Sequence, residues 1–228
     1  MIVYAKTTNP MLKQFINEAL KDNVTRIRVY DSSEEFWKHV SRKTPTLVIF
    51  DIRNASNSQL YNIKKVRKHS LLSFRRAPIL AVADQISDEK IIETLAMGAD
   101  DVLTSPFSPE MLVARLEAIG RRAERQTRNL AEKKLRYGDL EIDRTKNRVF
   151  VKGEKISLTP TEYDILVALV SKKNQLISKK DLIMTVWGYE DTLSSLSIGT
   201  HMLNLRRKLG KMGKLIKTER GKGYIFSR

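Results

Sequence analysis

Hydrophobic and polar positions alternate through the first half of the chain in a pattern that predicts strands and helices in turn. Residues 47–50, Leu-Val-Ile-Phe, form a continuous apolar run, which is typical of a strand buried on both faces of a sheet. Residues 87–97 repeat apolar positions at helical spacing and end before Gly98, a residue suited to the position after a helix. The whole pattern predicts strands at residues 1–5, 25–30, 47–50, 78–83 and 102–104, and helices at 10–21, 32–41, 60–68, 87–97 and 109–122.

This alternation predicts an α/β fold, a doubly wound sheet of five parallel strands. In such sheets the functional crevice lies beyond the carboxyl ends of the strands. Asp51 directly follows the apolar run 47–50, so its carboxylate is the first candidate for a functional group.

The second half of the chain has a different pattern. Short strands are expected at 137–142, 148–152 and 155–158, helices at 160–172, 179–187 and 196–209, and two closing strands at 215–218 and 224–226. Thr159 and Glu162 have the spacing of a capping box, and Pro160 suits the first helical position. Helices followed by a glycine-rich basic hairpin predict a smaller winged helix-turn-helix domain.

The segment between the two halves is dense in Arg, Lys, Glu and Gln and poor in large apolar residues. We therefore expect an α/β domain at 1–123, a linker at 124–136 and a winged helix-turn-helix domain at 137–228.

Charge is distributed unevenly along the chain, whose net charge is +16. Residues 1–123 hold 19 basic and 14 acidic side chains, and residues 124–228 hold 23 and 12, giving net charges of +5 and +11. A basic second half favours a polyanionic partner, and nucleic acid is the commonest. A basic surface without a specific partner is the alternative.

Several function classes are not expected. No apolar run approaches the roughly 18–20 residues of a membrane span, and residues 1–12 lack the layout of a secretory signal. There is no cysteine, and His39, His69 and His201 are scattered, so no metal or other cofactor is expected. The sequence shows no Walker-type loop and no nucleophile-base constellation, so it does not predict an enzyme. A reducing cytoplasm is the expected location.

Two sets of residues resemble one known family. Residues 98–107, Gly-Ala-Asp-Asp-Val-Leu-Thr-Ser-Pro-Phe, are similar to a Gly-Ala-Asp-Asp-Tyr-Leu-Thr-Lys-Pro-Phe run of OmpR/PhoB-type response regulators. Residues 158–163, 186–188, 205–209 and 218–224 are similar to the effector domain of the same branch. The resemblance implies a CheY-like receiver of a two-component system, joined to a domain that binds double-stranded DNA and regulates transcription.

The receiver departs from the family pattern around Asp51. The resemblance implies that phosphorylation of Asp51 needs a magnesium ion held by an acidic pair, but that position reads Lys6-Thr7. The family's phosphate-contacting lysine, sensing hydroxyl residue and aromatic switch residue correspond to Ser105, Ala83 and Val102. We therefore expect an atypical receiver in which Asp51 is a vestigial acceptor, paired to Lys6 or Arg53. A conventional regulator switched by phosphorylation of Asp51 is the alternative.

The resemblance also implies a homodimer through the fourth helix, fifth strand and fifth helix of the receiver. Charged residues match the family at this face, and a solvated charged surface is the alternative. The expected interface residues are Lys90, Asp100, Asp101, Glu110, Arg115 and Arg122.

The helix at 196–209 is expected to enter the major groove. Ile198, Met202, Leu205 and Leu209 share one face and are expected in the core. The opposite side is expected to present Gly199, Thr200, Leu203, Asn204 and Arg207. Asn204 can read adenine, and the methyl groups of Thr200 and Leu203 can meet thymine methyls. Gly199 in a helix costs about 1 kcal/mol, which suggests close approach to the groove.

Other contacts are implied by the resemblance alone. Trp187, His201, Arg206 and Thr218 match positions near phosphate, and Arg220 matches a wing arginine in the minor groove, with Lys222 and Tyr224 beside it. The loop 188–195 corresponds to a segment that touches RNA polymerase in some relatives, so activation and repression both stay open. Direct-repeat half-sites are the expected target. A protein-interaction module with a vestigial winged helix is the remaining alternative.

Overall fold

The computed structural model describes residues 2–19, 26–40, 43–128, 133–189 and 192–227. The chain divides into two compact units, Met1–Gly120 and Arg121–Arg228, each with its own hydrophobic core. Within the described ranges, no helix combines the length and the apolar character that a bilayer crossing requires.

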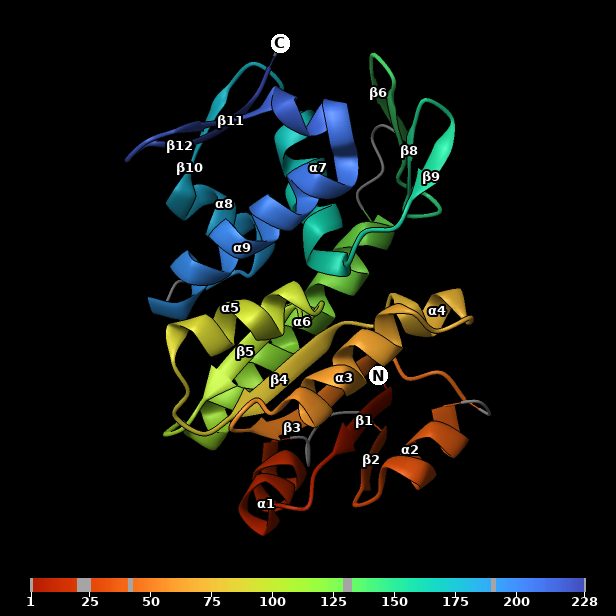
Figure 1. Ribbon diagram of the computed structural model, residues 1–228, viewed down its shortest axis with the longest axis vertical. Coiled ribbons are helices and arrows are strands. Elements are labelled where there is room, and N and C mark those ends of the chain that lie inside the picture. Colours follow the sequence, from red (N-terminus) through yellow and green to blue (C-terminus); the bar gives the residue numbers. More distant parts are fainter. Residues whose placement is uncertain (1, 20–25, 41–42, 129–132, 190–191, 228) are drawn as a thin grey trace. The chain divides into compact units, whose positions relative to one another are not determined.

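The first unit contains a sheet of five parallel strands in the order β2-β1-β3-β4-β5, which confirms the predicted α/β class (Figure 1). Chain order reverses between β1 and β3, which places Asp51 at the carboxyl end of β3 beside this switch point. The strands are β1 (Ile2–Lys6), β2 (Arg26–Tyr30), β3 (Leu47–Arg53), β4 (Ile79–Ala83) and β5 (Asp101–Thr104).

Helices cover both faces of this sheet. Leu12 and Ile16 of α1 and Leu116 of α6 share one buried cluster with alternate residues of β1, β3, β4 and β5. On the other face, the Phe36 ring of α2 lies 5.3 Å from the Phe50 ring of β3. The helices are α1 (Pro10–Ala19), α2 (Ser33–Val40), α3 (Asn57–Arg67), α4 (Leu72–Arg75), α5 (Asp88–Ala96) and α6 (Pro109–Arg128). The single turn α4 was not predicted, because so short a helix leaves no periodic pattern.

The second unit is a winged helix with two antiparallel sheets, in the orders β6-β7-β8-β9 and β10-β12-β11. The strand predicted at 137–142 is in fact two, β6 and β7, because Gly138 turns the chain at φ 56°. The elements are β6 (Lys134–Tyr137), β7 (Leu140–Asp143), β8 (Arg148–Val151), β9 (Glu154–Ile156), α7 (Pro160–Ser171), β10 (Leu176–Ser178), α8 (Lys179–Val186), α9 (Thr192–Leu209), the 3-10 helix η1 (Gly210–Leu215), β11 (Ile216–Glu219) and β12 (Gly223–Phe226).

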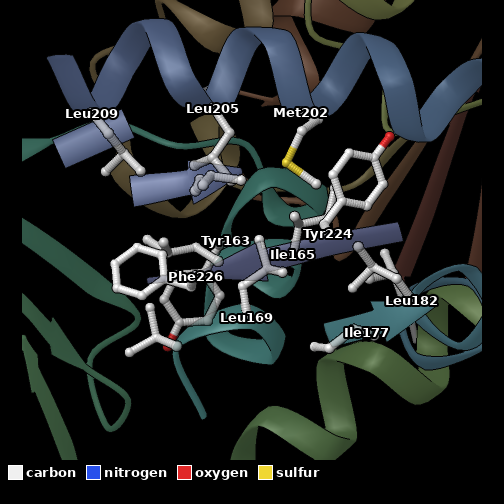
Figure 2. Close-up of a cluster of buried hydrophobic side chains, with 14 of the residues drawn as sticks. Tyr163, Ile165, Leu169, Ile177, Leu182, Met202, Leu205, Leu209, Tyr224 and Phe226 are labelled. Atoms are coloured by element: carbon white, nitrogen blue, oxygen red, sulfur yellow. The ribbon is translucent and has the colours of Figure 1, made fainter. Parts of the chain in front are cut away.

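The core of this unit is built around α9. Figure 2 shows Met202, Leu205 and Leu209 projecting from α9 toward side chains of α7, which include Ile165 and Leu169. Ile198, Met202, Leu205 and Leu209 are all at most 2% exposed, so the predicted inward stripe is confirmed. Burial of this stripe fixes which side of α9 faces outward.

The hairpin between β8 and β9 gives the first testable prediction. Lys152 and Gly153 form its two-residue loop with φ angles of 53° and 80°, as a type I′ turn requires. A lysine in the left-handed region is strained, whereas asparagine adopts it readily. Lys152→Asn is therefore expected to raise the free energy of unfolding of this unit by about 0.5–1 kcal/mol.

The measurement is urea unfolding followed by tryptophan fluorescence in a Trp37→Phe background, where Trp187 alone reports the second unit. Lys152→Ala is the matched control and is expected to give no gain, because alanine is as strained there as lysine. Equal stabilisation by both substitutions would contradict the turn assignment.

Candidate functional site

Helix α9, which we expect to be the recognition helix, is held to α7 by a buried carboxylate. Thr159 and Glu162 form the predicted capping box at the start of α7, in which the Thr159 amide donates to Glu162 Oε2 at 2.8 Å. The Lys208 ammonium, near the end of α9, donates to Glu162 Oε2 and Oε1 at 2.6 and 2.8 Å. Glu162 is 1% exposed. One side chain thus caps the first helix and fixes the end of the third.

A second side chain joins α9 to the wing. The Arg206 guanidinium donates through Nε to the Ile216 carbonyl at 3.0 Å and through Nη2 to Thr218 Oγ1 at 2.7 Å. Burial lowers the pKa of Arg206, and the nearby Tyr224 opposes that shift. Arg206 was expected near phosphate, but its nitrogens Nε and Nη2 are committed to β11. Its main structural role is to set the wing against the recognition helix.

The outward face of α9 is narrower than predicted. Leu203 is 66% exposed, and Gly199 and Arg207 are also exposed. The expectation that Thr200 and Asn204 face outward is wrong, because they are only 8% and 5% exposed. The Thr200 hydroxyl donates to the Leu196 carbonyl at 3.3 Å, and Asn204 Oδ1 accepts from Arg207 Nη2 at 2.8 Å. Asn204 therefore orients an exposed arginine.

Three other residues expected at the DNA surface are buried. Trp187 and His201 are each 1% exposed, and their rings lie 5.9 Å apart. Tyr224 is 9% exposed, pairs with Thr218 across β11 and β12, and has a pKa raised by burial. In this structure these side chains support the helix and the wing from within, and their expected contacts with DNA stay predictions.

The tip of the wing carries exposed positive charge. Thr218, Arg220 and Lys222 are all exposed, and the turn closes through the Lys222 amide, which donates to the Glu219 carbonyl at 2.9 Å. Gly223 is required nearby, because a Cβ there would lie 2.0 Å from the Ile177 carbonyl oxygen of β10. The structure thus presents two separate groups of exposed side chains, Leu203 with Arg207 on α9 and Arg220 with Lys222 on the wing.

Asp51 in the receiver has partners that sequence reasoning predicted only in part. Thr7 Oγ1 donates to Asp51 Oδ2 at 2.6 Å, and the Arg53 amide donates to Asp51 Oδ1 at 3.3 Å. Arg53 Nε lies 3.9 Å from Asp51 Oδ2, so the expected pairing with Arg53 is loose. Among the described residues Lys6 is not a partner of Asp51. The Thr7 contact was missed, since it joins residues 44 positions apart.

A magnesium ion, which the family resemblance implies at Asp51, does not fit the residues present. Mg²⁺ takes oxygen ligands, carboxylates above all, and a positively charged side chain beside them repels it. Here the position of the acidic pair is Lys6 and Thr7, and the Thr7 hydroxyl is turned toward Asp51 as a donor. In the part of the chain that is described, no three His, Cys, Asp or Glu side chains gather as a metal site.

Several charged side chains expected at a dimer interface form ion pairs within the chain instead. Asp101 pairs with Arg115 at 2.7 Å, and Asp100 pairs with Arg67 while accepting from the Ile79 amide at 2.9 Å. Asp100, Asp101 and Arg115 are at most 4% exposed, so they are not an open charged face. Lys90 pairs with Glu93 at 2.8 Å. Glu110 is exposed, and the Ser108 hydroxyl lowers its pKa; the Arg122 side chain lies outside the described set.

A receiver domain and a winged-helix effector in one chain define a DNA-binding transcription regulator of the response-regulator class. Residues 7–117 match the family described as "Response regulator receiver domain", and residues 153–226 match "Transcriptional regulatory protein, C terminal". The chain is 30% identical over 219 residues to the DNA-binding response regulator MtrA of Mycolicibacterium smegmatis, across 95% of this chain and 92% of that protein. The chain belongs to the OmpR/PhoB family of response regulators.

Two further comparisons agree with this assignment. The Escherichia coli phosphate regulon transcriptional regulatory protein PhoB is 29% identical over 200 residues, across 87% of this chain and 84% of that protein. A solved structure of a RitR mutant has a TM-score of 0.73, covers 100% of this chain and 99% of its own, and is 22% identical. This last likeness shows the same fold.

Removing the charge of Glu162 tests how α9 is held. Glu162→Gln keeps the size of the side chain but weakens both the ion pair with Lys208 and the cap at Thr159. Because the group is buried and charged, we expect a loss of about 1–3 kcal/mol in the free energy of unfolding of the second unit. Urea unfolding in the Trp37→Phe background measures this loss, and Glu154→Gln, at an exposed position, is the control. Equally small losses for the two substitutions would refute the claim that Glu162 stabilises the contact between α7 and α9.

Proposed function

We propose that this regulator binds specific DNA sites constitutively, without phosphorylation of Asp51. The observation that carries the proposal is the 2.6 Å hydrogen bond from Thr7 to Asp51, at the position where the family resemblance implies a metal-binding carboxylate. Phosphoryl transfer needs metal and cationic groups that neutralise developing charge. Asp51 has a hydroxyl, an amide and a distant arginine instead.

The proposed DNA contacts are the exposed side chains of α9 and the wing. Leu203 is placed to meet thymine methyls, and Arg207, oriented by Asn204, to reach a base edge or phosphate. Arg220 and Lys222 supply the positive charge of the wing, which suits a narrow minor groove. Arg206, Thr200, Trp187, His201 and Tyr224 act by positioning these groups.

The proposal extends to assembly and context. We propose a homodimer through α5, β5 and α6, supported by half-buried Lys90, by exposed Glu110 and by the exposed apolar side chains Ile92 and Met111 on those helices. Such a dimer would place two winged helices on direct-repeat half-sites in the cytoplasm, with RNA polymerase as a further partner. The proposed domains are 1–123 and 137–228. Because β6 (Lys134–Tyr137) belongs to a sheet of the second unit, we propose that the second domain begins a few residues earlier, at its first strand.

Selection of sites from random duplex DNA tests the proposal directly. We expect untreated protein and Asp51→Ala to select the same direct repeat with equal affinity. Treatment of the parent with acetyl phosphate is expected to change neither affinity nor mass. Tight binding that appears only after this treatment and disappears in Asp51→Ala would instead establish a conventional phosphorylation switch, and no selection by any form would remove DNA binding itself.

Substitution of Gly199 is expected to raise the stability of the second unit but to lower its affinity for DNA. A Cβ at Gly199 would meet nothing within 4 Å, so the fold has no need of glycine there. Gly199→Ala is expected to raise the free energy of unfolding by about 0.5–1 kcal/mol through helix propensity. If DNA approaches this face closely, the same methyl group is expected to weaken binding by about tenfold, or 1.4 kcal/mol.

Fluorescence anisotropy on the selected site and urea unfolding give the two values for Gly199→Ala. Ser171→Ala, at an exposed position in α7, serves as the control for a gain in helix propensity and is expected to leave affinity unchanged. A Gly199→Ala protein that binds as tightly as the parent would show that this face of α9 does not approach the groove.

A further inference from the structure

A cavity of about 220 Å³ opens at the carboxyl edge of the receiver sheet. It lies between the start of α1, the ends of β3 and β4, and the loop that follows β5. We call it the receiver pocket and define it by Leu12, Phe15, Asp51, Val82, Asp84 and Phe107. By comparison with a 150 Å³ cavity that binds benzene, its volume suits a molecule of roughly nine non-hydrogen atoms.

The walls of the receiver pocket are apolar. Leu12 is 4% exposed and Val82 is also 4% exposed, and both belong to the core cluster on this face of the sheet. The Phe15 and Phe107 rings meet edge to face, with centroids 5.9 Å apart. Small-molecule sites combine such walls with a few fixed polar groups. These surfaces can bury a hydrocarbon or aromatic body but offer no set of oxygen ligands to a metal.

The charged groups of the receiver pocket are both acidic. Asp51 lies deep, since its side chain is 8% exposed, whereas Asp84 is an exposed residue at the rim. No Lys, Arg or His is among the residues that line it. In the described part of the chain Asp51 has one cationic partner within 4 Å, Arg53, at 3.9 Å and with a side chain that is 49% exposed, so water screens its charge. An anion would be repelled here, and a cation would be attracted.

The deep carboxylate is oriented before any ligand arrives. Thr7 Oγ1 donates to Asp51 Oδ2 and itself accepts from the Asn9 amide at 2.9 Å, so the hydroxyl has a fixed direction. Among the residues that the structure describes, Asp51 Oδ1 accepts only from the Arg53 amide, at 3.3 Å. A carboxylate has about four acceptor positions, so Asp51 keeps capacity for a further donor.

From this geometry we infer that the receiver pocket binds a small apolar molecule carrying one ammonium group. The ammonium donates to Asp51, with Asp84 adding attraction at the rim, and the apolar body packs against Leu12, Phe15, Val82 and Phe107. The ligand would brace the loop after β5, which leads into α6. This gives the receiver an input that needs neither a kinase nor a metal.

Titration calorimetry on the full chain with 2-phenylethylamine tests this inference without DNA. The neutral and anionic probes 2-phenylethanol and phenylacetate have similar bodies and serve as comparisons. We expect saturable binding of one amine per chain, at least about tenfold tighter than that of the alcohol, because an ionised pair strengthens the hydrogen bond. No binding is expected for phenylacetate.

Variants locate the site. Asp51→Asn and Asp84→Asn are each expected to weaken amine binding severalfold, whereas Asp88→Asn, an exposed carboxylate on α5 outside the pocket, leaves it unchanged. Ser105→Leu adds bulk to the pocket lining, keeps both carboxylates, and is expected to abolish binding. Circular dichroism and the unfolding midpoint show that each variant is folded.

Three outcomes would overturn the inference. The first is the absence of saturable amine binding, and the second is equal affinity for the amine and the alcohol. The third is that added magnesium chloride displaces the amine whereas sodium chloride of equal ionic strength does not. The last outcome would assign the pocket to a metal ion. Because the readout contains no DNA, these results are independent of whether the protein regulates transcription without phosphorylation.

Discussion

The arrangement of the second unit depends on holding α9 from one side only. A helix that is to enter a DNA groove has to bury one face firmly and leave the other bare. The stripe from Ile198 to Leu209 supplies the burial, which is non-directional and fixes rotation about the helix axis. The directional bonds lie near its end, where Glu162 holds Lys208 and Ile216 holds Arg206. Apolar packing thus sets which face is presented, and the charged contacts set its angle to the wing.

In the receiver, too, the fold and the residues at the edge of the sheet are set by different interactions. Parallel strands gather their carboxyl ends at one edge, whatever residues stand there. The apolar cluster that these strands share with α1 and α6 includes neither Thr7 nor Ser105 among its described members, whereas Ala83 is buried in β4 itself. We therefore expect that the residues at positions 7 and 105 can vary while this apolar cluster is kept. The shared fold is therefore no evidence for or against phosphorylation of Asp51.

The sequence was informative where a feature is set by local chemistry. The inward stripe of α9 follows from helical spacing, and the start of α7 follows from Thr159, Pro160 and Glu162, because capping joins residues three positions apart. The fold class followed from the alternation of strands and helices. What failed was set by neighbours far along the chain. The buried state of Asn204, the Thr7–Asp51 contact and the short strand β10, paired with β12, leave no local pattern to detect.

These failures share a physical cause that bears on how such regulators are interpreted. A match to a family contact position tells only which residue type stands there. The role of that residue depends on whether its side chain is already bonded to another part of the same chain. Arg206 already donates to the wing through two nitrogens, and Asp101 and Arg115 pair with each other at 2.7 Å, so the Asp101–Arg115 pair would have to break to serve a partner molecule. Breaking a buried charged pair is costly because the other charge is left unpaired. Side chains such as Leu203 and Arg220 meet no such cost, and specificity is therefore expected to reside in them.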